Sequence, residues 1–159
     1  MIRKVGISVA ATLILALSAT LALAQSGHFL TGGGNAVQCF DAGTYVECSG
    51  KVAGLGGTTF QIDVTASGIA SVECINPAGN RAPGQDTSVT TSGSSGPLAT
   101  PRNGQYRFTV ETNPPTVPNT PTCPNAQWTA EVVDVTFTTA TLTLREDGAI
   151  SDQITVPVQ

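Results

Sequence analysis

Apolar and polar residues alternate with a period of two along most of the chain after residue 36. The clearest case is the segment 58–66, in which Phe60, Ile62 and Val64 share one side and polar residues occupy the other. Such alternation is typical of a β-strand that buries one face. The pattern recurs in three further segments, 45–53, 69–75 and 105–112. No sustained helical periodicity follows the first 24 residues, so we expect an all-β fold.

The segment 128–145 is too long and too rich in Thr and Val for one flat strand. Its apolar positions change phase along the way. We expect the buried side chains to be first Val133, Val135 and Phe137, and then Ala140, Leu142 and Leu144. A β-bulge near Thr138 and Thr139 would produce this change, because one extra residue shifts every later side chain to the opposite face.

Seven or eight short strands, joined by turns rich in Gly, Pro and Asn, predict an antiparallel β-sandwich of immunoglobulin-like type. A β-barrel is the alternative. We place this domain at residues 37–159, after a flexible lead-in at 25–36 that contains three consecutive glycines. Two long connections interrupt the strands: a polar loop at 76–101, with a short edge strand near 87–91, and a segment at 113–125 that contains five prolines.

The last hairpin turns at Asp147 and Gly148. A two-residue loop would set Leu144 opposite Ser151, which mismatches the apolar faces of the two strands. A three-residue loop that includes Glu146 pairs Leu144 with Ile150 instead. We therefore expect the three-residue loop.

Residues 1–24 have the features of a secretion signal. Arg3 and Lys4 precede a nearly unbroken apolar run from 9 to 23, and Ala22 and Ala24 form a small-x-small cleavage site before Gln25. We expect a secreted protein, extracellular or periplasmic. No later apolar stretch is long enough to span a membrane, and the last residues carry no hydrophobic anchor.

Removal of the signal leaves 5 basic and 11 acidic residues, a net charge of −6. This acidic balance argues against nucleic acid or an anionic membrane as the partner. A glycan or a cell-surface protein is the candidate partner that this composition leaves open.

Four cysteines in a secreted chain predict two structural disulfides. If Gly43 and Thr44 form a two-residue hairpin loop, counting outward sets Cys39 opposite Cys48 at a non-hydrogen-bonded pair, where two strands approach most closely. Cys74 and Cys123 would then form the second bond. A zinc site is the weaker alternative, because the spacing contains no Cys-x-x-Cys pair.

The sequence offers no organised catalytic group, cofactor site or metal site. His28 is the only histidine and lies in the expected flexible lead-in, where no packed scaffold would hold a catalytic base. The acidic residues near the last hairpin match no calcium loop. Three aromatic side chains, Tyr45, Tyr106 and Trp128, are the candidate ligand contacts, as a platform that stacks on sugars. A row of threonines from 136 to 143 is explained by the strand propensity of threonine.

The segments 48–57, 74–80, 83–85 and 123–130 resemble a group of small secreted bacterial proteins that are usually labelled hypothetical. The resemblance covers most of the chain after the signal. It implies a secreted, single-domain protein, and it implies no activity and no functional residues.

We therefore expect a secreted, non-catalytic β-sandwich with a binding or structural role at or near the bacterial cell surface. A carbohydrate-binding accessory module is the alternative. Binding chemistry on β-sandwiches is concentrated in loops. The long connections at 76–101 and 113–125 are accordingly where we expect a contact surface.

Overall fold

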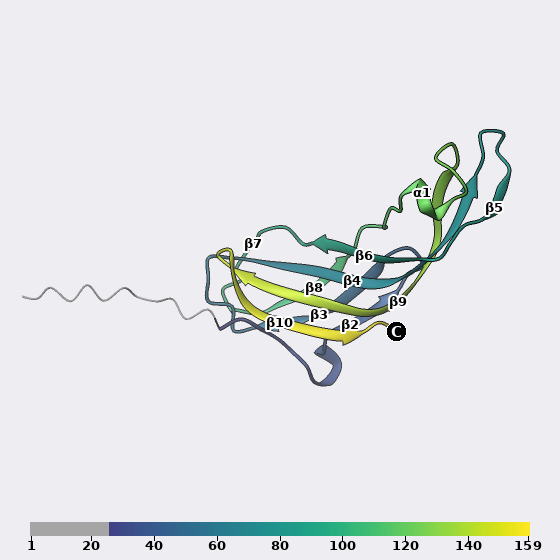
Figure 1. Cartoon of the computed structure of the whole chain (residues 1–159). Coiled ribbons are helices and arrows are strands. Elements are labelled where there is room, and N and C mark those ends of the chain that lie inside the picture. The colour runs from purple at the N-terminus through teal and green to yellow at the C-terminus, as the bar shows by residue number, and fades with distance from the viewer. Residues whose placement is uncertain (1–25) are drawn as a thin grey trace, which may run out of the picture.

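A computed structural model describes residues 26–159, so the expected signal peptide lies outside the described residues. The domain is all-β and consists of two antiparallel sheets that pack face to face (Figure 1). The predicted β-sandwich is confirmed, and the alternative of a closed barrel is wrong. The immunoglobulin-like type remains a prediction. Between residues 26 and 159, no helix is long and apolar enough to cross a membrane.

The smaller sheet has β3 (Val46–Ala53) at its centre. β8 (Tyr106–Glu111) pairs with one edge of β3, while β2 (Gln38–Asp41) and β1 (His28–Phe29) pair with the other. β2 and β3 form the hairpin that the sequence predicts, with Cys39 opposite Cys48. The Cα atoms of these two cysteines are 4.1 Å apart, which fits the close, non-hydrogen-bonded pair that we expected.

The larger sheet is built on β4 (Thr59–Ile75), which pairs with β9 (Thr129–Glu146) along its whole length. β10 (Ala149–Pro157) covers the far edge of β9. Three shorter strands line the opposite edge of β4: β7 (Leu98–Ala99), β6 (Thr87–Ser94) and β5 (Arg81–Pro83). The expected strands at 58–66 and 69–75 are therefore one strand. The described residues contain ten strands, more than expected, because β1, β5 and β7 are too short to show alternation.

The hydrophobic core lies between the two sheets and uses the apolar positions that alternation predicts. Phe60, Ile62 and Val64 of β4 are almost completely buried against Phe108 and Val110 of β8 and their neighbours. The core also includes the disulfide Cys39–Cys48, whose two cysteines have no exposed surface.

β9 contains the predicted bulge. Ser67 pairs with Thr139 and Gly68 pairs with Phe137, so Thr138 is the extra residue. A second irregularity leaves Val133 without a partner, and its side chain is 45% exposed. The expectation that Val133 is buried is therefore wrong, because two bulges change the phase of the strand and the sequence pattern revealed one.

The last hairpin has the other register from the one we expected. Asp147 and Gly148 form a two-residue loop, both with positive φ (47° and 86°), and Ala149 pairs with Glu146. The face mismatch is corrected by a bulge at Ser151, after which Asp152 pairs with Leu144. The three-residue loop is thus wrong, since the extra residue lies in β10 and not in the turn.

The segment 25–36, which we expected to be a flexible lead-in, contains structure from Ser26 onward. His28 and Phe29 form β1, and Phe29 packs edge-on against Phe108 with ring centroids 5.8 Å apart. A short 3-10 turn, η1 (Gly33–Asn35), follows. His28 itself is exposed, and its Nδ1 lies 3.0 Å from the carbonyl oxygen of Ser26.

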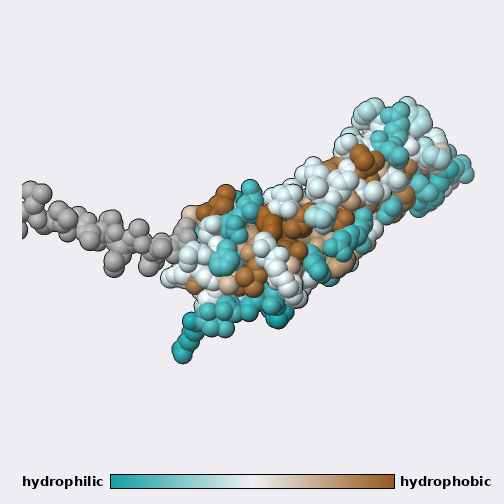
Figure 2. Space-filling model, turned by 90° about the horizontal axis from the view of Figure 1, so that it is seen from below, coloured by the Kyte–Doolittle hydropathy of each residue, from teal (hydrophilic) through white to brown (hydrophobic). Residues whose placement is uncertain are grey.

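The far ends of β4 and β9 extend beyond the sandwich as an arm, together with β5 and the short turn α1 (Asn119–Thr122) (Figure 1). The disulfide Cys74–Cys123 joins β4 to the proline-rich segment in this arm. Pale and hydrophilic residues dominate the far end of the arm in Figure 2. The two disulfides indicate that the protein folds outside the reducing cytoplasm.

The two sheets approach each other along both edges of the sandwich. On one side, the amide of Gln159 donates to the carbonyl oxygen of Cys39 at 3.0 Å, so the end of the chain after β10 reaches β2. On the other side, Gly93 of β6 lies directly against Glu111 of β8. A Cβ atom at Gly93 would be 1.8 Å from the carbonyl oxygen of Glu111.

Gly93→Ala is expected to lower the free energy of unfolding by about 1–3 kcal/mol, because the new methyl group meets rigid backbone that must move. Denaturant unfolding of the mature protein measures the loss. Gly34→Ala is the matched control, since a Cβ atom there has nothing within 4 Å, and it should change stability by less than about 0.5 kcal/mol. Equal effects of the two substitutions would contradict the close contact between the sheets.

Candidate functional site

The three aromatic candidates do not form one platform. Tyr106 is half-buried at the start of β8, opposite Val52, and its ring packs edge-on against Phe60 at 5.1 Å. Tyr45 lies just before the start of β3, whereas Tyr106 lies beside the end of β3. Trp128 precedes β9 in the arm, and both Tyr45 and Trp128 are half-buried. The structure therefore places these rings at three separate positions.

The carboxylates near the last hairpin bind the protein's own backbone. Glu146 has no exposed surface and accepts hydrogen bonds from the amides of Gly27 (2.9 Å), Gly56 (2.7 Å) and Gly57 (3.1 Å). Burial raises the pKa of Glu146, but these amide donors more than offset that effect, so its pKa lies below the usual value. Asp152 accepts a hydrogen bond from the amide of Phe29 at 2.8 Å.

Asp147 holds the neighbouring loop. The hydroxyl of Thr58, together with the amides of Thr59 and Thr58, lowers the pKa of Asp147 to about 2. Across residues 26–159, no group of three His, Cys, Asp or Glu side chains could hold a metal ion. In the described structure, these carboxylates connect the loops at one end of the sandwich.

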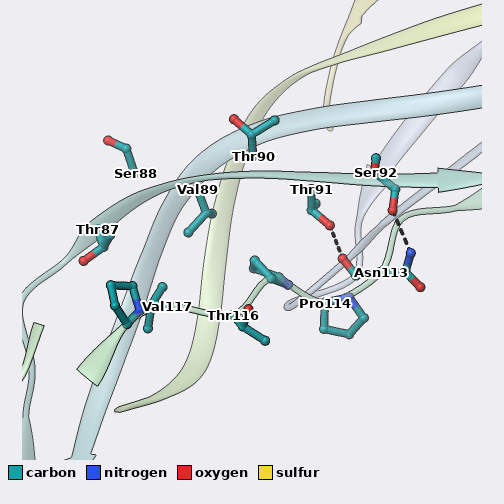
Figure 3. A pocket seen from close by; sticks show the side chains of 12 residues that line it. Thr87, Ser88, Val89, Thr90, Thr91, Ser92, Asn113, Pro114, Thr116 and Val117 are labelled. Carbon is teal, nitrogen blue, oxygen red and sulfur yellow. Dashed lines mark hydrogen bonds between the residues drawn. The ribbon is translucent and has the colours of Figure 1, made fainter. Parts of the chain in front are cut away.

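A groove of about 390 Å³ runs along β6 and is the candidate binding site (Figure 3). One wall is residues 87–92 of β6, and the other is the proline-rich segment 113–118. These two walls belong to the two long connections in which we expected a contact surface. Figure 3 shows Val89 and Thr91 pointing towards the proline-rich wall, while Ser88 and Thr90 point to the other side of β6.

The groove begins where the two walls separate. The backbone and side-chain amides of Asn113 both donate to the carbonyl oxygen of Ser92, at 3.0 and 2.9 Å, and the hydroxyl of Thr91 donates to the carbonyl oxygen of Asn113. Pro114 and Pro115 follow and have no N–H group, so the pairing with β6 stops at Asn113. Because the two segments are not paired beyond this point, a hollow remains between residues 87–91 of β6 and the proline-rich segment.

The groove is uncharged. Its lining residues are Thr, Ser, Val, Asn and Pro, and none is acidic, basic or aromatic. Hydroxyl groups and backbone amides and carbonyls are therefore the groups that it offers to a ligand. Such a surface favours a neutral ligand that forms hydrogen bonds over an anion, a cation or a ring that requires stacking.

Small hydroxyl side chains also cover the outer face of the larger sheet. Thr65 pairs with Ser92 on one side and with Thr141 on the other, and Thr141 pairs with Thr155. The hydroxyl oxygens of Thr141 and Thr155 are 2.9 Å apart. The threonine row seen in the sequence is thus extended across four strands, because β4, β6 and β10 place Ser and Thr beside it. We call this surface the hydroxyl face.

No family model and no curated protein sequence matches the chain. Among solved structures, it is similar to a β-glucuronidase from Bacteroides uniformis, with 16% identity and a TM-score of 0.34 over 83% of this chain and 14% of that one. It is also similar to a putative β-galactosidase from Bacteroides fragilis, with 12% identity and a TM-score of 0.29 over 83% of this chain and 17% of that one. The chain thus spans a small part of the length of either enzyme.

Proposed function

We propose that this protein is a secreted, non-catalytic β-sandwich that binds an uncharged partner at or near the bacterial cell surface, with the β6 groove as its binding site. The observation that carries the proposal is the groove itself: about 390 Å³, open beside an edge strand and lined by uncharged polar residues from the two long connections. Loops held by a rigid scaffold are where binding residues concentrate in β-sandwiches.

The proposed location rests on two independent features. Residues 1–24 have the charge and apolar pattern of a secretion signal. Both disulfides would form in an oxidising compartment, such as the periplasm or the exterior. After signal removal the net charge is −6, which makes an anionic membrane an unfavourable partner.

The proposed absence of catalysis rests on the engagement of the carboxylates. Glu146, Asp147 and Asp152 accept hydrogen bonds from backbone amides and hold loops together. A general acid or base needs a carboxylate that faces the substrate with an accessible oxygen. Our proposal therefore gives these residues a structural role.

Purified mature protein should bind envelopes isolated from the source bacterium, and Thr116→Trp should weaken this binding about tenfold by filling the groove. A labelled-protein pull-down measures the binding. Thr31→Trp is the matched control, because Thr31 is exposed and lies outside the groove. Equal binding by the wild type and Thr116→Trp would refute the groove as the site. Hydrolytic turnover that is lost on Asp152→Asn would refute the non-catalytic role.

A carbohydrate-binding accessory module is the second candidate, and the hydroxyl face favours it. Rows of Ser and Thr offer a sugar many hydrogen-bond partners. On a glycan array, binding that persists in Thr116→Trp but is lost in Thr141→Val, at the centre of the hydroxyl face, would favour this candidate over the groove.

A further inference from the structure

The outer edge of β6 carries backbone groups that the sheet does not use. In an antiparallel pair, successive residues direct their N–H and C=O groups alternately towards the partner strand and away from it. The carbonyl of Ser92 points away from β4, because it accepts from Asn113, whereas the amide of Ser95 donates to Ile62 of β4 at 2.9 Å. Ser88 and Thr90 lie four and two residues before Ser92, at the same alternate positions of β6. Their N–H and C=O groups therefore point outward.

No residue in the described part of the chain, 26–159, completes this edge. The proline-rich wall leaves β6 after Asn113, and Pro114, Pro115 and Pro118 cannot donate a hydrogen bond. The side chain of Thr90 bonds within the sheet, with its hydroxyl oxygen 3.3 Å from that of Ser67. The outward N–H and C=O groups of Ser88 and Thr90 therefore have no partner strand, and they recur about 7 Å apart along β6, beside an open groove.

We propose that the β6 groove holds an extended peptide segment of a partner protein, which pairs as an added strand with the outward backbone groups of Ser88 and Thr90. The inference rests on the proposed function and names the chemistry of the partner. An added strand presents the alternating donors and acceptors that such an edge requires. The absence of charged lining residues fits a segment that is recognised by its backbone and by small or β-branched side chains.

The same observations disfavour two other occupants. A sugar would form hydrogen bonds with side-chain hydroxyls and would usually stack on an aromatic ring. No aromatic residue lines the groove. A second copy of this chain, paired edge to edge through the same four backbone groups, would still need about 1,000 Å² of buried surface to be stable. Four backbone groups along a short edge supply a small part of that area.

Thr90→Pro tests the backbone contact, and Thr90→Ala is its matched control. Both substitutions remove the threonine hydroxyl, but only proline removes the N–H group. Proline is tolerated there because this N–H does not contribute to the β4 ladder. The probe is a phage-displayed library of linear peptides, selected on the mature protein with both disulfides intact. Selected peptides should bind Thr90→Pro about tenfold more weakly than the wild type, and Thr90→Ala within about twofold.

Amide hydrogen exchange provides a second measurement that does not depend on a variant. Bound peptide should slow the exchange of the amides of Ser88 and Thr90, whereas those of Val89 and Thr91 already lie in the ladder. Failure to select any linear peptide, or equal binding by Thr90→Pro, would overturn the inference. So would a glycan ligand that is lost in Thr90→Ala, or a dimer of the wild type that Thr90→Pro dissociates.

The envelope assay separates this inference from the proposed function. Binding that Thr116→Trp abolishes and Thr90→Pro leaves intact would keep the groove as the site and reject strand pairing. Binding that neither substitution affects would reject the groove altogether.

Discussion

The double variant Cys74→Ala/Cys123→Ala is expected to lose about 4 kcal/mol of unfolding free energy. This disulfide closes a loop with a sequence separation of 49 residues, so its removal returns much conformational freedom to the unfolded chain. The arm that it joins has few other buried residues, of which Thr122 is one. We therefore expect the arm to depend on the covalent bond more than the sandwich does.

Denaturant unfolding under non-reducing conditions measures this loss. The matched control is Cys39→Ala/Cys48→Ala, whose disulfide has a sequence separation of only 9 residues and should contribute about 2–3 kcal/mol. Both pairs are buried, so they differ in loop length and in place, one in the core of the sandwich and the other in the arm. A larger loss in the short-loop variant would show that local packing, and not loop closure, sets the stability of these bonds. Hydrogen exchange should also show β5 opening first in the long-loop variant.

Local features of this fold could be predicted from the sequence. The register of β2 against β3 depends only on a turn at Gly43 and Thr44 and on counting outward, and the pairing of Cys39 with Cys48 confirms it. The bulge at Thr138 could also be predicted, because the change in apolar phase lies within one strand. In both cases, residues close together in the chain carry the whole signal.

Features that depend on distant partners could not be predicted in the same way. The three-residue loop predicted for the last hairpin is wrong because the bulge at Ser151 shifts the phase of β10. The apolar pattern alone therefore does not reveal the length of the turn. The hydroxyl face depends on the register of four strands, which brings Thr65, Thr141 and Thr155 together. The groove depends likewise on how β6 lies beside residues 113–118.

The sequence contains a signal for the buried position of Glu146. This residue follows Ala140, Leu142 and Leu144 at the same alternate spacing, so it occupies a position that points into the protein. A carboxylate in that phase must find hydrogen-bond donors, because an unpaired buried charge is very costly. The donors are glycine amides, and a Cβ atom at Gly27 would lie 2.6 Å from Oε2 of Glu146.

Glu146→Gln is expected to lower the free energy of unfolding at neutral pH by about 3 kcal/mol. The amide of Gly27 donates to Oε2, and those of Gly56 and Gly57 donate to Oε1, so both oxygens accept from backbone. Glutamine has one oxygen and one NH₂ group, and the NH₂ group would face at least one amide donor. Glu131→Gln is the matched control: its carboxylate is 48% exposed and pairs with Arg81 at 2.8 Å, so a loss below about 1 kcal/mol is expected.

The pH dependence of the unfolding free energy tests whether the charge of Glu146 is the cause of this loss. Because the amides of Gly57, Gly56 and Gly27 outweigh burial and hold the pKa of Glu146 below its usual value of 4.5, the folded protein binds this proton more weakly than the unfolded chain does. Its stabilisation is complete above that value and is lost as the pH falls through the lowered folded pKa. The wild type should therefore lose more stability than Glu146→Gln between pH 7 and about pH 3. If the stabilities of the wild type and Glu146→Gln fell in parallel as the pH is lowered, the charge of Glu146 would not be the cause. The shape of the side chain would then connect the N-terminal segment to the sandwich.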